Sequence, residues 1–205
     1  MIDDFAKNYL HDDLREMREV LVWKLDGLSE YDVRRPLTAT GTNLLGMVKH
    51  YAYSSARYFG EVFDRPFPED AVPRWDDETA WKNELWVAPH ETREQILDLY
   101  RRVAEHADAT IEALPVDAPG NVPWWPRPNV KLFNVMVHSL TEAARHAGHA
   151  DILRERLDGA IGVGAWSENP HDAQYWETER AMIEQAARAA DPEGADRAAS
   201  DPGPA

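Results

Sequence analysis

One proline-free stretch of the sequence, from Asn129 to Gly159, constrains the fold more than any other feature. Its only glycine before the last residue is Gly148. Its apolar residues recur at steps of three and four: Phe133, Val137, Leu140, Ala144 and Ala147. This period is typical of an amphipathic α-helix. Asn129 can cap the start of the helix and Gly159 can end it, so the stretch predicts one long helix.

Three further segments of the sequence have the same helical period: residues 4–27, 42–63 and 91–114. Thr42 or Asn43 can cap the second segment, and Pro115 ends the third. In the first segment, several charged residues lie outside the apolar stripe, including Arg18 and Lys24. We expect these charged side chains in solvent.

The links between these segments contain many Pro, Trp and acidic residues and no convincing strand. This pattern predicts an all-α four-helix bundle whose first and second links are long enough to be crossovers rather than tight hairpins. Residues 172–190 predict a short closing helix. We expect the bundle domain to cover residues 1–189, and a flexible acidic tail rich in Pro and Ala to cover residues 190–205.

Charge and composition exclude several function classes. The formal net charge is −15 and the pI is about 4.9, so binding to nucleic acid or to an anionic membrane is unfavourable. The sequence contains neither a long uninterrupted apolar segment nor the basic and apolar start of a secretory signal, so we expect a cytoplasmic protein. Because the chain has no cysteine, it has no disulfide, no thiolate ligand and no cysteine nucleophile.

The polar residues in the middle of the last long helix indicate a metal site. Glu142 and His146 lie one turn apart on one face, and His138 and His149 share their stripe. Side chains four residues apart approach within about 5–6 Å, so both can reach one ion. A carboxylate and an imidazole without a thiolate suit zinc, nickel, iron(II) or manganese better than copper(I). A third ligand must come from another segment, and His50 is the best candidate.

Other interpretations of these residues stay open. His50 can be a structural histidine, and Glu142 can form an exposed ion pair of little energetic value with a neighbouring arginine. His149 is the main alternative ligand, and His138 is a weaker one. Arg57 and His149 are candidate substrate-binding residues. The sequence assigns no residue a direct catalytic role.

The segment GMVKHYAYSSARYF, which contains His50, and the Glu142–His146 pair followed by GHADILRERLDG resemble the DinB-like superfamily. The branch that the chain resembles most contains mycothiol-dependent maleylpyruvate isomerase, and the likeness covers residues 14–159. Many members have two histidines in the last pair, whereas a glutamate and a histidine are similar to the maleylpyruvate isomerase type. The resemblance implies His50, Glu142 and His146 as ligands of a divalent metal, zinc or nickel. It also implies an up-down-down-up bundle that is frequently a homodimer.

Members of this superfamily with known activity are metal-dependent thiol S-transferases, so the resemblance implies a transferase or isomerase acting on a small electrophile. The thiol cosubstrate would be mycothiol, bacillithiol or glutathione. Three protein ligands leave an open position on a metal, and coordination there lowers the pKa of a thiol. Two alternatives remain: a metal-dependent hydrolase, and a non-catalytic bundle that binds a metal or a small molecule.

Overall fold

The computed structural model describes residues 4–68, 72–77, 83–162 and 171–200. The chain divides into two compact units, residues 1–159 and residues 160–205. The first unit contains the bundle and the candidate site.

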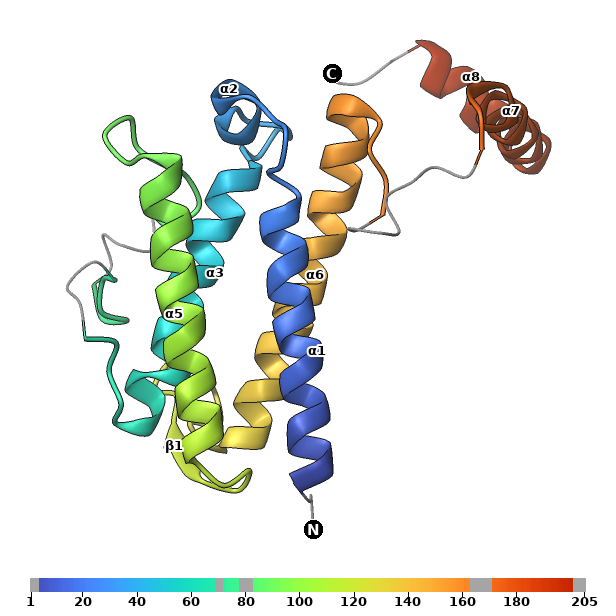
Figure 1. The fold of residues 1–205 in the computed structure, drawn as a ribbon. Helices are drawn as coiled ribbons and strands as arrows, with labels where there is room; N and C mark the ends of the chain where they lie inside the picture. The colour runs from blue at the N-terminus through green and yellow to red at the C-terminus, as the bar shows by residue number, and fades with distance from the viewer. Residues whose placement is uncertain (1–3, 69–71, 78–82, 163–170, 201–205) are drawn as a thin grey trace. The chain divides into compact units, whose positions relative to one another are not determined.

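Four long helices form the first unit: α1 (Asp4–Trp23), α3 (Leu44–Phe59), α5 (Arg93–Ala113) and α6 (Leu132–Asp158). In Figure 1, α1 and α6 run upward and α3 and α5 run downward, which is an up-down-down-up bundle. α1 packs mainly on α6, and α3 packs mainly on α5. The all-α bundle predicted from the sequence is therefore confirmed.

The links contain short elements that the sequence did not predict. The first link includes α2 (Glu30–Arg34), and η1 (Glu61–Phe63) follows α3. Two three-residue strands, β1 (Pro119–Asn121) and β2 (Asn129–Lys131), pair antiparallel just before α6. The expectation of no strand was therefore wrong, and the N-cap of α6 is Lys131 rather than Asn129, because Asn129 lies in β2.

The helix α3 is the centre of the bundle. Every residue of α3 is buried except His50, which is partly buried. The predicted apolar face is confirmed, but the opposite side is also covered, and it carries the buried cations Lys49 and Arg57. Asn43 caps the helix, because its side chain accepts a hydrogen bond from the backbone N–H of Gly46 at 2.7 Å.

Arg18 of α1 and Lys24, which directly follows α1, are buried, contrary to the sequence-based expectation. Arg18 forms an ion pair with Asp108 of α5, and its guanidinium also donates to the carbonyl of Ala104 at 3.1 Å. Lys24 forms an ion pair with Asp151 of α6. These positions lie between helices, where a buried cation requires a carboxylate or carbonyl partner.

The buried face of α6 is rotated from the predicted one. Val137 and Ala144 are exposed, whereas the buried face follows a line of mostly small residues. Its central members are Ser139, Ala143, Ala147 and Ala150. Glu142 and His146 therefore lie at the edge of the core and not in open solvent.

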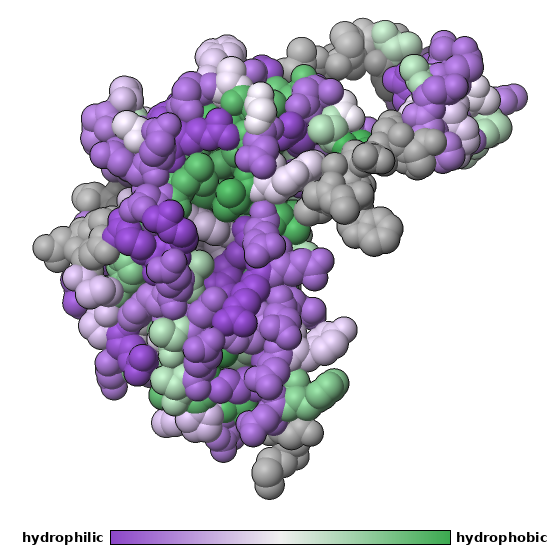
Figure 2. Space-filling model, viewed as in Figure 1, coloured by the Kyte–Doolittle hydropathy of each residue, from purple (hydrophilic) through white to green (hydrophobic). Residues whose placement is uncertain are grey.

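A wide groove separates α1 from α5. It has a volume of about 1180 Å³, and its floor includes Val22, Trp23, Leu97 and Tyr100. Figure 2 shows this apolar surface hollowed between the two helices.

The second unit contains α7 (Ala173–Ala190) and α8 (Pro192–Ser200). The predicted closing helix is confirmed by α7, whose N-cap is Asp172. The domain boundary at residue 189 stays a prediction, and so does the flexible tail, within which the structure has α8. The sequence also predicts a short helical turn at about residues 78–85, most of which lie outside the described residues. Among the described helices, none is long and apolar enough to span a membrane.

Candidate metal centre

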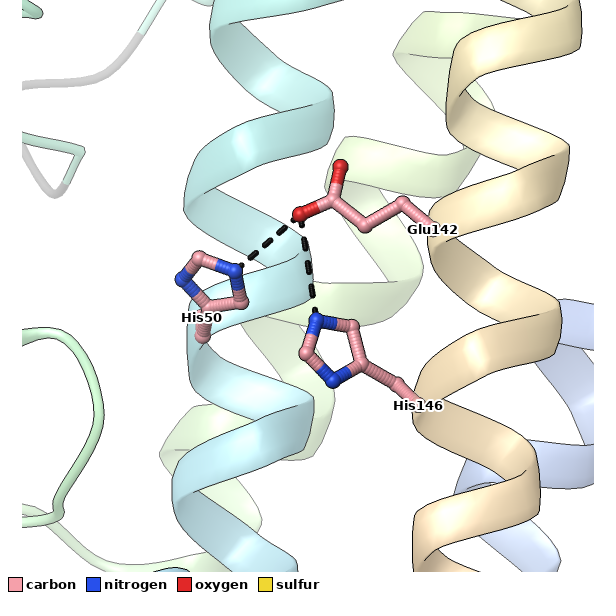
Figure 3. A group of neighbouring side chains, drawn as sticks. All are labelled: His50, Glu142 and His146. Carbon is pink, nitrogen blue, oxygen red and sulfur yellow. Dashed lines mark hydrogen bonds and ion pairs between the residues drawn. The ribbon is translucent and has the colours of Figure 1, made fainter.

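Three side chains from two helices meet at one point of the bundle. His50 comes from the middle of α3, and Glu142 and His146 come from successive turns of α6. One donor atom of each lies within 4.8 Å of the other two, and among the described residues only these three form such a group. Figure 3 shows both imidazoles directed at the same carboxylate oxygen of Glu142. The structure thus brings His50 of α3 together with the Glu142–His146 pair of α6.

His50 lies between two carboxylates. Its Nε2 is 3.1 Å from Oε1 of Glu142, and its Nδ1 is 2.9 Å from Oε1 of Glu84. Burial alone would lower the pKa of His50, but the hydrogen bonds to Glu142 and Glu84 outweigh it and raise the pKa to about 9. A metal that binds Nε2 must therefore replace a proton there.

Glu142 is the shared partner of both histidines. Its Oε1 lies 3.8 Å from Nε2 of His146. Burial alone would raise the pKa of Glu142, but the nearby His146 imidazole and the hydrogen bond with His50 outweigh it and lower the pKa to about 2. The carboxylate is therefore ionised at neutral pH, as a metal ligand must be.

Glu84 is a component of the site that the sequence did not predict. Its side chain is only 3% exposed, and its Oε2 accepts a hydrogen bond from Nη1 of Arg57 at 3.0 Å. It lies in the link between η1 and α5, which holds many acidic residues. The sequence has no spacing or period that distinguishes Glu84 from the other acidic residues of this link. Only its contacts in the folded structure identify it as part of the site.

The two residues proposed as substrate-binding occupy different environments. The side chain of Arg57 is 2% exposed and its guanidinium bonds Glu84 and the carbonyl of Pro73. This burial favours a supporting role for Arg57 over direct contact with a substrate. His149 is exposed, and its ring centre lies 6.1 Å from that of His146. Its role in substrate binding stays a prediction.

A cluster of ring side chains, here called the aromatic wall, reaches Glu142 through His138. It consists of Tyr58, Trp124, Trp125 and His138. The His138 ring packs edge-on against Tyr58 at 4.9 Å and against Trp125 at 4.7 Å. Its Nε2 is 3.7 Å from Oε2 of Glu142, and burial lowers the pKa of His138. These contacts favour His138 as part of the wall over His138 as a ligand.

The donor set fits a divalent metal. Two imidazoles and one carboxylate on facing helices are a ligand set found in catalytic zinc sites, which keep an open fourth position. Nδ1 of His50 already has a carboxylate partner, which is the usual arrangement for a metal-binding histidine. Nδ1 of His146 is buried and has no hydrogen-bond partner among the described residues.

Comparison with known proteins identifies the family. The family model described as Mycothiol-S-transferase matches residues 9–159, which is most of the chain and all of the bundle except the first residues of α1. The chain belongs to the mycothiol-S-transferase family. The predicted resemblance to the mycothiol-dependent branch of the DinB-like bundles is thereby confirmed. A comparison with curated proteins finds no match. The mycothiol-S-transferase match ends at the last turn of α6, so it includes both parts of the candidate centre.

Proposed function

We propose that this protein is a metal-dependent thiol S-transferase, in which a small thiol of the mycothiol type attacks a small electrophile. One observation carries the proposal: donors from His50, Glu142 and His146 converge within 4.8 Å in a chain of the mycothiol-S-transferase family. We propose zinc as the ion, with nickel as the alternative, because the donors are two imidazoles and a carboxylate.

The side chains of this centre would bind the metal, and the reacting thiol would come from a cosubstrate. His50, Glu142 and His146 would hold the ion and leave one position open to a cosubstrate. A divalent ion held there lowers the pKa of a bound thiol, so that it reacts as a thiolate at neutral pH. The thiol must be a cosubstrate because the chain has no cysteine.

The aromatic wall supports a small electrophile as the second substrate. Tyr58 and Trp125 pack against His138, whose Nε2 lies 3.7 Å from Oε2 of Glu142, and Trp125 donates its indole N–H to the Tyr58 hydroxyl at 3.2 Å. This hydrogen bond fixes the two rings relative to each other. A fixed apolar surface beside a polar centre is typical of sites for small organic molecules.

Metal analysis and a thiol-consumption assay test the proposal together. We expect about one zinc ion per purified chain, and thiol-dependent conversion of a bimane-type electrophile that is fastest with mycothiol. His50→Ala and His146→Ala should each lose the ion and lower the rate by about 100-fold or more. The matched control is His90→Ala, because His90 is exposed and outside the donor group.

Two results would change the proposal in different ways. Loss of the ion in His149→Ala but not in His146→Ala would show that His149, and not His146, is the ligand. A zinc-loaded protein that consumes no thiol with any electrophile would exclude the transferase, and the hydrolase or the non-catalytic bundle would take its place.

A further inference from the structure

We propose that residues 83–86, in the link between η1 and α5, are held on α3 so that Glu84 contacts His50, and that Glu84 is a positioning residue for the metal centre. This inference rests on the proposed function, because it gives His50 the role of a metal ligand. It assigns a role to residues outside the donor group.

Side chains of α3 hold the backbone of the link on both sides of Glu84. Lys49 donates from Nζ to the carbonyls of Asn83 at 3.3 Å and Trp86 at 3.2 Å. Asn43 donates from Nδ2 to the carbonyl of Leu85 at 3.0 Å. The backbone carbonyls of residues 83, 85 and 86, on both sides of Glu84, are therefore held by α3 and its N-cap residue.

Gly46 makes this close contact possible. A Cβ atom at residue 46 would lie 2.2 Å from the carbonyl oxygen of Leu85, far inside van der Waals contact. The clash is with backbone, which cannot rotate away as a side chain can. Glycine at position 46 therefore provides the space in which the link approaches α3.

The Glu84 side chain is itself fixed at both oxygens. Oε1 bonds Nδ1 of His50 at 2.9 Å, and Oε2 accepts from Nη1 of Arg57 at 3.0 Å. Arg57 lies two helical turns after His50 on α3, so one helix supplies both the ligand and the cation that holds its partner. The carboxylate is thus presented to the imidazole in one orientation.

The chemical consequence concerns the nitrogen of His50 that faces Glu142. A carboxylate that accepts the Nδ1 proton fixes the tautomer in which Nε2 carries the free lone pair, and it also fixes the direction of the ring. Partners of this kind change metal affinity by about 10–100-fold when removed. Glu84 would therefore strengthen metal binding without touching the ion.

Zinc affinity of the full chain, measured by competition with a chromophoric chelator, tests this role. We expect Glu84→Ala to weaken zinc binding by about 10–100-fold. Gly46→Ala should weaken it by about tenfold, although Gly46 contacts no ligand, because the added methyl group displaces Leu85 and with it Glu84. The matched control is Gly148→Ala on α6, where an added Cβ meets nothing within 4 Å and zinc affinity should not change.

A second variant separates positioning from a merely structural role. Glu84→Ala leaves the Arg57 charge buried without its carboxylate, so the metal-free protein should be less stable. The double variant Arg57→Met/Glu84→Leu removes both charges and should recover that stability, because apolar replacement of a buried pair is tolerated. Zinc affinity should stay low in the double variant, and the visible spectrum of the cobalt(II)-loaded form should differ from that of wild type.

The outcomes distinguish this inference from the proposed function. Wild-type zinc affinity in Glu84→Ala, or recovery of affinity together with stability in the double variant, would overturn the positioning role alone. A wild-type chain that binds no zinc would overturn the proposed function and this inference together.

Discussion

Asp108 is the residue on which the contact between α1 and α5 depends most. His11, Arg15 and Arg18 of α1 all bond its carboxylate, with Nε2 of His11 at 2.8 Å and Nε of Arg15 at 3.0 Å. Burial alone would raise the pKa of Asp108. The hydrogen bond with His11 and the charges of Arg18 and Arg15 outweigh burial, and they hold the pKa well below its ordinary value.

This network predicts a loss of stability in acid. A carboxyl group whose folded-state pKa is lowered stabilises the fold above its unfolded pKa of about 3.9, and this contribution is lost as the pH falls below that value. Asp108→Asn should lower the free energy of unfolding by about 3 kcal/mol at neutral pH. The difference from wild type should shrink in acid, and urea unfolding at several pH values measures it.

The control for this prediction is Asp98→Asn. Asp98 forms exposed ion pairs with Arg101 and Arg102, so its loss should cost less than about 1 kcal/mol. An equal effect of the two variants would show that burial of Asp108 does not matter.

Single residues also show where sequence reasoning succeeds. Glu142 and His146 could be paired in advance because a four-residue step on one helix fixes their separation. Arg18 was placed in solvent because its partly buried partner Asp108 belongs to another helix, and the sequence gives no sign of that pairing. Glu84 was missed for the same reason, since its partners lie on α3.

At the level of elements, the long helices were predictable and their exact faces were not. The central buried residues of α6 are Ser139, Ala143, Ala147 and Ala150. Their small side chains contribute little to the hydrophobic periodicity of the sequence. Larger residues such as Val137 dominated the periodic signal although they lie outside the core. Small residues face the core because they let neighbouring helices approach closely, and this depends on tertiary packing.

The start of α5 offers a test at the same level. Thr92 and Gln95 form a capping box, in which each side chain accepts a hydrogen bond from the backbone N–H of the other residue. Thr92→Ala should lower the free energy of unfolding by about 1 kcal/mol and leave zinc affinity unchanged. Thermal unfolding and the chelator assay measure the two quantities, and Thr92→Ser is the control that keeps the cap. A large loss of zinc affinity in Thr92→Ala would show that the start of α5 controls the metal centre.

For the whole molecule, the main prediction concerns the residue at which the bundle domain ends. The family match and the first compact unit both end at residue 159, whereas the composition predicts a domain that reaches residue 189. We expect a chain that ends at residue 159 to unfold cooperatively and to bind zinc, because the bundle core and all three donors lie within it. We expect a chain that ends at residue 189 to match the full-length protein.

Circular dichroism and zinc titration of the two truncated chains measure this prediction. A shorter chain that fails to fold, beside a longer one that does, would place residues 160–189 inside the domain. Light scattering on the same samples tests the predicted homodimer, and a monomer at all concentrations would contradict it.

The arrangement of the helix pairs has one more consequence. α1 with α6, and α3 with α5, are the closely packed pairs, and the groove occupies one of the two seams between them. The donors of His50 and of Glu142 and His146 face each other across the other seam. An ion held there would cross-link the two pairs of helices, so binding of the ion would stabilise the bundle as well as supply its chemistry.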